Sequence, residues 1–167
     1  MTDVDKIYLV GFMGAGKSTV ARALAARLSW QVEDIDERIE ARERLTVADI
    51  FRIRGELYFR ALERDALRAL LPARHVVVAT GGGTFADPDA RALMLADGLV
   101  IWIDAPLDVV IERVPTDGRR PLAMDRAQFE QLYCSRRRAY QQAHLRFESG
   151  RGPLDELVER VLDRLGW

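Results

Sequence analysis

Short runs of apolar residues alternate along the chain with longer segments in which apolar residues recur every three or four positions. The short runs are typical of buried strands, and the longer segments are typical of amphipathic helices. This alternation predicts a single α/β domain over residues 1–167 with a mainly parallel sheet. The expected strands are 6–10, 32–36, 75–80, 99–103 and 145–147, and the expected helices include 17–28, 36–44, 46–54, 55–71, 106–114, 126–143 and 153–165.

Three positions mark helix boundaries by their chemistry. Thr46 is expected to cap the helix that runs to Arg54, because a threonine hydroxyl accepts a free backbone N–H of the first turn. Gly55 is expected to separate that helix from the next. Asp87, followed by a proline, predicts the start of another helix.

Composition excludes several classes of protein. Hydrophobic residues make up 49% of the chain and charged residues 31%, as in ordinary globular domains. The net charge of -1 argues against the large basic surface of a nucleic-acid-binding protein. A single cysteine, Cys134, excludes an internal disulfide and favours a cytoplasmic location. The N-terminal residues predict neither a signal peptide nor a membrane span.

The strongest motif follows the first expected strand. Residues 11–18 read Gly-Phe-Met-Gly-Ala-Gly-Lys-Ser and match G-x-x-x-x-G-K-[ST], the phosphate-binding loop of nucleotide-binding proteins. Such a loop points backbone N–H groups at phosphate oxygens, and its lysine and serine serve the phosphates and Mg²⁺. The motif therefore predicts ATP and Mg²⁺ as cofactors. The residues expected to bind the nucleotide are Gly14, Ala15, Gly16, Lys17, Ser18 and Thr19.

Acidic and glycine-rich segments follow two other expected strands. If residues 32–36 form a strand, Asp34 and Asp36 share one face, where one could hold Mg²⁺ and the other accept a hydroxyl proton. The alternative is a solvated acidic helix start. The glycines at 81–83 fit a loop that touches a ligand, or else a flexible turn. We read Asp104 as a helix cap or turn residue without a functional role.

Arginines supply candidate anion contacts. In the expected helix 126–143, Arg136 falls on the apolar face, whereas Arg137 and Arg138 do not. A guanidinium group on that face needs an anion, which is either a ligand or an acid within the protein. Periodicity does not tell where Arg60 points. Residues 115–125 are expected to form a mobile loop, whose Arg119 and Arg120 are either charge stabilisers for phosphoryl transfer or solvated.

Together these segments resemble the shikimate kinase family. The resemblance spans Lys6 to about Phe147 and rests on an ordered set of motifs. These are the loop 11–18, Asp-x-Asp at 34–36, Ala-Asp-Ile-Phe-x-x-x-Gly-Glu-x-x-Phe-Arg at 48–60, the glycines 81–83, Arg-Pro-Leu at 120–122, and an arginine four residues before a tyrosine at 136–140. Two positions depart from the family pattern: Arg138 stands where a proline is common, and Phe85 is bulkier than expected.

The resemblance implies a fold and a reaction. The fold would be that of nucleoside monophosphate kinases, a five-stranded parallel sheet of order 2-3-1-4-5 with helices on both faces and a mobile lid at about 115–125. The reaction would transfer the γ-phosphoryl group of ATP to the 3-hydroxyl of shikimate.

The resemblance also implies residue roles. Asp34, with Ser18, would place the metal, and Asp36 would hold the acceptor hydroxyls and could act as base. The acceptor carboxylate would be clamped by Arg60 and Arg136, and Arg120 would touch the phosphates. The glycines expected to line the acceptor pocket are Gly81, Gly82 and Gly83.

Two other functions fit part of the pattern. One is a kinase that acts on another small hydroxy acid, such as gluconate, since paired arginines favour a carboxylate but do not choose among rings. The other is a regulatory module that binds a nucleotide without catalysis. Size and family suggest a monomer.

Overall fold

The fold is known from a computed structural model that describes residues 3–113 and 125–167. Its centre is a five-stranded parallel sheet of order β2-β3-β1-β4-β5, which confirms the order that the family resemblance implied. The strands are β1 (Lys6–Val10), β2 (Gln31–Asp34), β3 (Val76–Ala79), β4 (Leu99–Asp104) and β5 (Leu145–Glu148).

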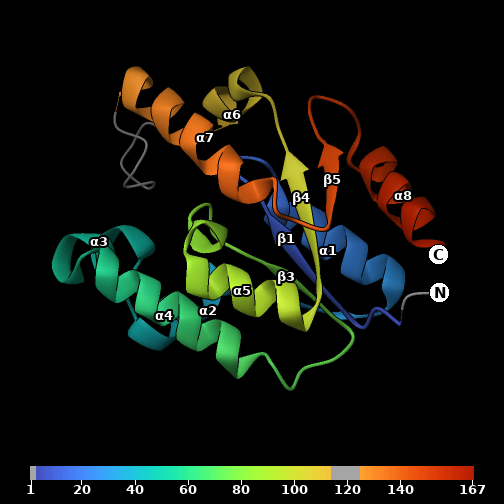
Figure 1. Ribbon diagram of the computed structural model, residues 1–167, viewed down its shortest axis with the longest axis horizontal. Coiled ribbons are helices and arrows are strands. Elements are labelled where there is room, and N and C mark those ends of the chain that lie inside the picture. Colours follow the sequence, from blue (N-terminus) through green and yellow to red (C-terminus); the bar gives the residue numbers. More distant parts are fainter. Residues whose placement is uncertain (1–2, 114–124) are drawn as a thin grey trace.

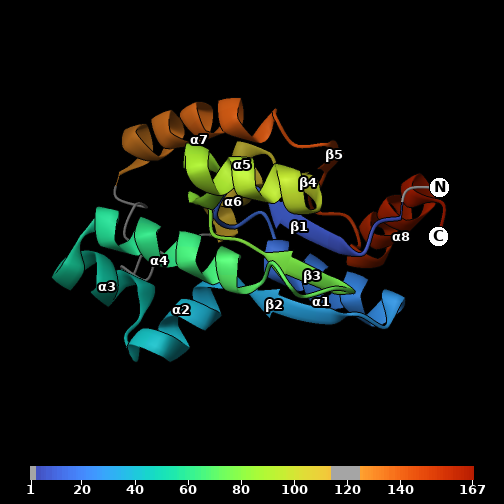
Figure 2. The ribbon, with the colours of Figure 1, turned by 60° about the horizontal axis from the view of Figure 1, so that its bottom comes forward.

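Helices cover both faces of the sheet (Figure 1). The connection from β1 to β2 crosses the sheet in the direction opposite to the later connections. Since crossovers between parallel strands are right-handed, its helix must lie on the opposite face from theirs. Figure 2 shows α1 with α8 on one face, and α4, α5 and α7 on the other. The helices are α1 (Lys17–Leu28), α2 (Ile35–Glu43), α3 (Val47–Arg54), α4 (Glu56–Ala69), α5 (Pro88–Asp97), α6 (Leu107–Arg113), α7 (Arg126–Tyr140) and α8 (Leu154–Leu165).

The helix boundaries follow the predicted capping chemistry. The Thr46 side chain accepts the backbone N–H of Asp49 at 3.1 Å, and Asp87 caps α5, whose first residue is Pro88. Gly55 separates α3 from α4 with a φ of 86°, which favours glycine. Helix α7 ends at Tyr140, three residues before the expected end, and a single 3-10 turn at Thr84–Ala86 was not predicted.

The core lies around the three central strands. Every residue of β1 and β3 is buried, as expected for strands that are covered on both faces. Gly11 continues β1 with a φ of 149°, and a Cβ there would collide with the backbone carbonyl of Ile103. Glycine at this position therefore lets the chain pass close to β4 as it leaves the central strand and enters the phosphate loop. In the part of the chain that the structure describes, no helix is both long and apolar enough to cross a membrane.

A buried lysine joins the amino end of the sheet to two helices. Lys6 is fully buried, and its Nζ lies 2.7 Å from Asp97 at the end of α5. The same Nζ donates to the carbonyls of Leu70 and Leu71 just beyond α4, at 2.8 and 3.1 Å. Tyr8 donates its hydroxyl to Asp97 as well. Because this network lies at the amino ends of the strands, it stabilises the fold away from the functional edge.

Replacing Lys6 tests this network. We expect Lys6→Met to lower the free energy of unfolding by about 3 kcal/mol, because it removes the cationic partner of Asp97. The control is Arg74→Ala, because Arg74 is a half-exposed neighbour of Asp97 at 3.9 Å. This control should cost less than about 1 kcal/mol. Urea denaturation measures both, and equal losses would contradict the assignment.

Candidate active site

The loop at 11–18 curls at the carboxyl end of β1 and leads into α1. Gly14 and Gly16 have φ values of 80° and 95°, in the left-handed region that other residues avoid. Lys17 is buried, and its Nζ donates to the carbonyls of Gly11 and Phe12 at 2.7 and 2.9 Å. The lysine charge thus lies over its own loop at the start of a helix, an arrangement suited to phosphate oxygens.

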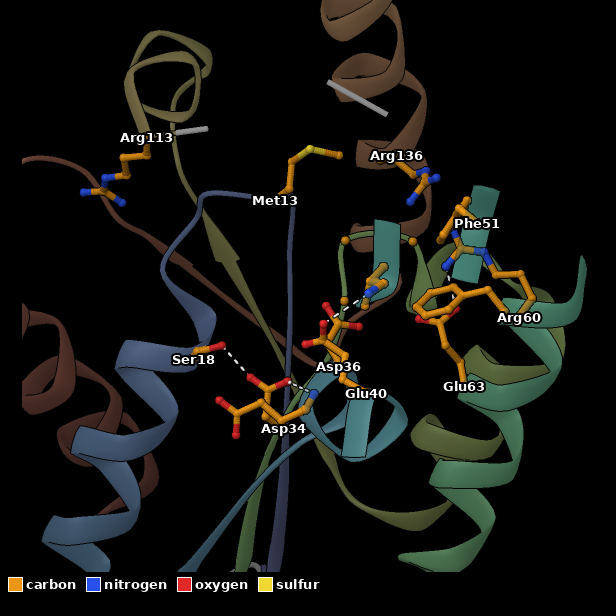
Figure 3. Close-up of a pocket in the computed structure, with 16 residues that line it drawn as sticks. Met13, Ser18, Asp34, Asp36, Glu40, Phe51, Arg60, Glu63, Arg113 and Arg136 are labelled. Carbon is orange, nitrogen blue, oxygen red and sulfur yellow. Dashed lines mark hydrogen bonds and ion pairs between the residues drawn. The ribbon is translucent and has the colours of Figure 1, made fainter. Parts of the chain in front are cut away.

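Ser18 and Asp34 lie together beside this loop. The serine hydroxyl donates to Asp34 Oδ2 at 2.7 Å (Figure 3). A hydroxyl and a carboxylate are hard oxygen donors, which fits Mg²⁺ held by few protein atoms and otherwise by phosphate and water. Among residues 3–113 and 125–167, no cluster of three or more acidic, histidine or cysteine side chains suited to a metal occurs.

The acidic pair is brought together by a helix start and not by a strand. Strand β2 ends at Asp34, whose Oδ1 accepts the backbone N–H of Glu37 and so caps α2. Asp36 lies in the first turn of α2. The prediction that both residues share a strand face is therefore wrong. Both nevertheless line the same cavity, because the first helical turn lies at its edge.

A cavity of about 440 Å³ opens beside the phosphate loop, and many of the side chains that line it are charged. Figure 3 shows the acids Asp34, Asp36 and Glu40 together, with Arg60 and Arg136 on the other side. Such a division suits a ligand that has hydroxyl groups at one end and an anion at the other.

Arg60 is held in place on several sides. Its Nη1 lies 2.5 Å from Glu63, and its Nη2 lies 3.2 Å from Glu56. The guanidinium carbon lies 5.9 Å from the ring centroid of Phe51 and 5.5 Å from that of Phe59. Burial alone lowers the pKa of Arg60, but the two glutamates outweigh it and raise that pKa above its usual value. Arg60 therefore stays charged in a fixed orientation.

Arg136 reaches the same place from α7. Figure 3 shows its guanidinium group near that of Arg60. A Cβ built on Gly83 would lie 2.5 Å from Nη1 of Arg136, and Nη2 of Arg60 would be closer still. No carboxylate within the described ranges forms an ion pair with Arg136. The glycine thus leaves room for two arginines at one point, and the internal salt bridge considered for Arg136 is absent there.

The glycine loop is fastened to both neighbouring helices. Tyr140 of α7 donates its hydroxyl to the carbonyl of Gly82. The N–H of Gly81 donates to the hydroxyl of Thr84 at 3.1 Å, and Thr84 in turn donates to Glu63 of α4. Gly81, Gly82 and Gly83 all line the cavity. The glycine loop is therefore a tethered wall of the cavity, and not the flexible turn that was the alternative interpretation of these glycines.

Comparison with known proteins agrees with this geometry. The chain matches the family model described as shikimate kinase over residues 13–166. A shikimate kinase from Persephonella marina is 43% identical over 161 residues, which cover 95% of this chain and 98% of the relative. The chain belongs to the shikimate kinase family.

Solved structures give the same result. A shikimate kinase from Acinetobacter baumannii, solved in complex with shikimate, has a TM-score of 0.93 at 32% identity and covers 98% of this chain and 93% of its own. A thymidylate kinase from Candida albicans has a TM-score of 0.60 at 14% identity, with 98% and 91% covered, and it shares the fold alone. The fold is thus that of phosphate-loop nucleotide kinases, as expected.

A second cavity, of about 310 Å³, lies on the other side of the phosphate loop. It is lined by Gly16 and Thr19, by Arg113 at the end of α6, and by Pro153 before α8. Arg113 also borders the first cavity, and its Nη2 donates to the carbonyl of Gly150 at 2.7 Å. The loop therefore separates two ligand-sized spaces, one of which has the divided charge described above. Sequence patterns did not indicate Arg113, because α6 shows only a short apolar periodicity.

The structure corrects the interpretation of Asp104 as a helix cap or turn residue. It is buried and accepts hydrogen bonds from Arg137 at 2.6 Å and from Arg146 at 2.8 Å. Both guanidinium groups also lie over the ring of Trp102, at 4.8 and 5.1 Å from its centroid. Asp104 is thus an ion-pair centre that joins α7 to β4 and β5, and not a simple cap. Its partners are more than thirty residues away in sequence, so local patterns could not reveal them.

Of the remaining positions singled out from the sequence, the structure describes two and leaves two arginines outside the described residues. Phe85 is fully buried and does not line the cavity, and Arg138 is exposed. Arg119 and Arg120 lie outside the described residues, as does the predicted lid apart from Asp125, which caps α7. Their roles stay predictions.

Replacing Asp104 tests its part in fixing α7. We expect Asp104→Asn to lower the free energy of unfolding by about 3 kcal/mol, because two guanidinium groups lose their buried carboxylate. Glu148→Gln is the matched control, since Glu148 is an exposed partner of the same Arg146. This control should change the free energy by less than about 1 kcal/mol in urea denaturation. A loss no larger than the control's would show that Asp104 does not anchor the helix.

Proposed function

We propose that the protein transfers the γ-phosphoryl group of ATP to the 3-hydroxyl of shikimate, which gives shikimate 3-phosphate. The observation that carries this proposal is the cavity beside the phosphate loop, with acids on one side and two arginines on the other. Shikimate has hydroxyl groups at one end of its ring and a carboxylate at the other, so it matches this division. Membership of the shikimate kinase family favours this acceptor over gluconate and over a module without catalysis.

The nucleotide phosphates bind along residues 14–19 in this proposal. Backbone N–H groups and the Lys17 charge surround the β- and γ-phosphates. The cavity next to Thr19 and Arg113 takes the nucleoside, because it adjoins the loop on the side away from the acceptor. Ser18 and Asp34 hold Mg²⁺, which when bound neutralises phosphate charge. Arg120 is assigned to the phosphates by family resemblance alone.

The acceptor binds in the larger cavity. Arg60 and Arg136 pair with its carboxylate, because their guanidinium groups converge at Gly83. Asp36 accepts hydrogen bonds from the ring hydroxyls and orients the attacking oxygen toward the phosphate loop. The glycines at 81–83 let the ring approach the backbone. Phosphoryl transfer depends mainly on alignment and charge stabilisation, and this arrangement supplies both.

An assay of ADP release with shikimate as the sole acceptor tests the reaction. We expect ADP release to depend on ATP, Mg²⁺ and shikimate together, with phosphate on the 3-hydroxyl by nuclear magnetic resonance. Lys17→Ala should abolish turnover, because the positive charge that neutralises the phosphates is lost. The proposal fails if shikimate leaves ADP release at its acceptor-free rate while another hydroxy acid, such as gluconate, stimulates it.

Separate substitutions of Arg136 and Arg138, which are neighbours in α7, test the carboxylate clamp. We expect Arg136→Ala to raise the KM for shikimate at least about thirtyfold, because a charge-assisted contact to the carboxylate is lost. The KM for ATP should stay within about twofold, since the nucleotide phosphates are bound by other residues. Arg138→Ala is the matched control from the same helix, because Arg138 is exposed, and it should leave both KM values unchanged. A normal KM for shikimate in Arg136→Ala would remove Arg136 from the clamp.

A further inference from the structure

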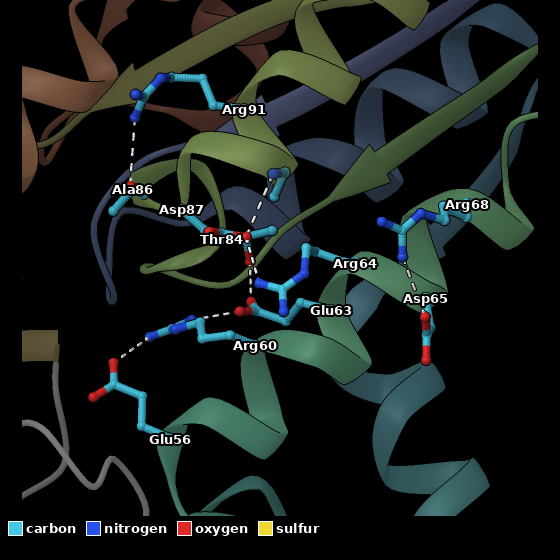
Figure 4. Close-up of polar contacts among 11 residues, drawn as sticks. Glu56, Arg60, Glu63, Arg64, Asp65, Arg68, Thr84, Ala86, Asp87 and Arg91 are labelled. Carbon is cyan, nitrogen blue, oxygen red and sulfur yellow. Dashed lines mark hydrogen bonds and ion pairs between the residues drawn. The ribbon is translucent and has the colours of Figure 1, made fainter.

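A chain of buried hydrogen bonds connects the glycine loop to Arg60 (Figure 4). It runs from the N–H of Gly81 to the hydroxyl of Thr84, and from that hydroxyl to Oε2 of Glu63. The other oxygen of Glu63, Oε1, accepts from Nη1 of Arg60. Thr84 is 0% exposed and Glu63 only 1%, so water does not compete for these contacts.

The direction of each hydrogen bond in this chain is fixed. A backbone N–H can only donate, so Gly81 occupies an acceptor site of the Thr84 oxygen. The Thr84 proton is then directed at Glu63. A guanidinium group also only donates, so Glu63 accepts at both oxygens. This pattern suits an ionised carboxylate that is held at both of its oxygens.

The surroundings of Glu63 make the threonine contact important. Burial raises the pKa of Glu63 above its usual value, and the Arg60 charge and the Thr84 hydroxyl each counteract this rise. Arg136 of α7 also favours the ionised form. Asp36 of α2 faces Glu63 across the space that a Cβ on Gly81 would fill. Without Thr84, one oxygen of a buried carboxylate loses its hydrogen bond.

We propose that Thr84 is a positioning residue for the acceptor: through Glu63, its hydroxyl fixes the direction in which Arg60 presents its guanidinium group to the acceptor carboxylate. This inference rests on the proposed function for the identity of the acceptor. Because the same hydroxyl binds the N–H of Gly81, it also fixes the distance between the glycine loop and Arg60. Thr84 does not line the cavity, so it acts on the ligand only through its neighbours.

Two substitutions of Thr84 separate the hydroxyl from the rest of the side chain. Thr84→Val keeps the shape and removes the hydroxyl, whereas Thr84→Ser keeps the hydroxyl. We expect Thr84→Val to raise the KM for shikimate about tenfold, the usual cost of a lost hydrogen bond to a charged group. Thr84→Ser should stay within about twofold, and the KM for ATP should not change in either variant. If Thr84→Val does not fold, as judged by circular dichroism, the smaller Thr84→Ala replaces it.

A double-mutant cycle with Glu63→Ala, which removes both side-chain oxygens, tests whether Thr84 acts through Glu63. If it does, Thr84→Val has no further effect on the KM for shikimate once Glu63 is replaced. If Thr84 only supports the glycine loop, Thr84→Val should instead raise the KM for shikimate by the same factor with and without the Glu63 substitution. That result, or a KM for shikimate in Thr84→Val equal to that of the wild type, would overturn the inference.

A titration that needs no substrate separates this inference from the proposed function. The Glu63 carboxyl is followed by carbon-13 nuclear magnetic resonance in the wild type and in Thr84→Val. Because the hydroxyl favours the ionised carboxylate, its removal should raise the pKa of Glu63 further, and an unchanged pKa would overturn the role of Thr84. If the wild type does not phosphorylate shikimate, the proposed function fails, and this titration still decides whether Thr84 acts on Glu63.

Discussion

Positive charge gathered at the carboxyl edge of the sheet is the constraint on which the rest of the structure depends. Arg60 and Arg136 converge at Gly83, and Arg113 lies across the same cavity. Like charges at this spacing repel one another unless acids or a bound anion lie among them. Glu56 and Glu63 balance Arg60, whereas Arg136 is directed at the cavity. The carboxylate of an acceptor supplies negative charge at the point where it is needed.

The scaffold brings these groups together from distant segments. The parallel sheet directs the phosphate loop, the start of α2 and the glycine loop to one edge. Asp104 joins α7 to β4 and β5, and Tyr140 joins the same helix to the glycine loop. Arg136 directly precedes Arg137, the first of these attachments along the helix, so its direction is set by the frame around it. Function at this edge therefore depends on contacts that do not touch the ligand.

Sequence patterns predicted the local structure well and the contacts across the fold poorly. The strands and the caps at Thr46 and Asp87 follow from short-range chemistry, and the strand order came from family resemblance. The strand face assigned to the acidic pair was wrong, because Asp34 ends its strand by capping a helix. The roles of Asp104 and Glu63 were missed, since their partners Arg137 and Thr84 are 33 and 21 residues away in sequence. Periodicity carries no information on such pairs.

The claim that the arginine side of the cavity recognises a carboxylate is tested most directly by comparing two ligands. Calorimetric titration measures the affinity of the wild-type protein for shikimate and for its carboxamide, in which an uncharged amide replaces the carboxylate. The account predicts that the carboxamide binds at least about a hundredfold more weakly, because both guanidinium groups lose their anion. Equal affinities would contradict it.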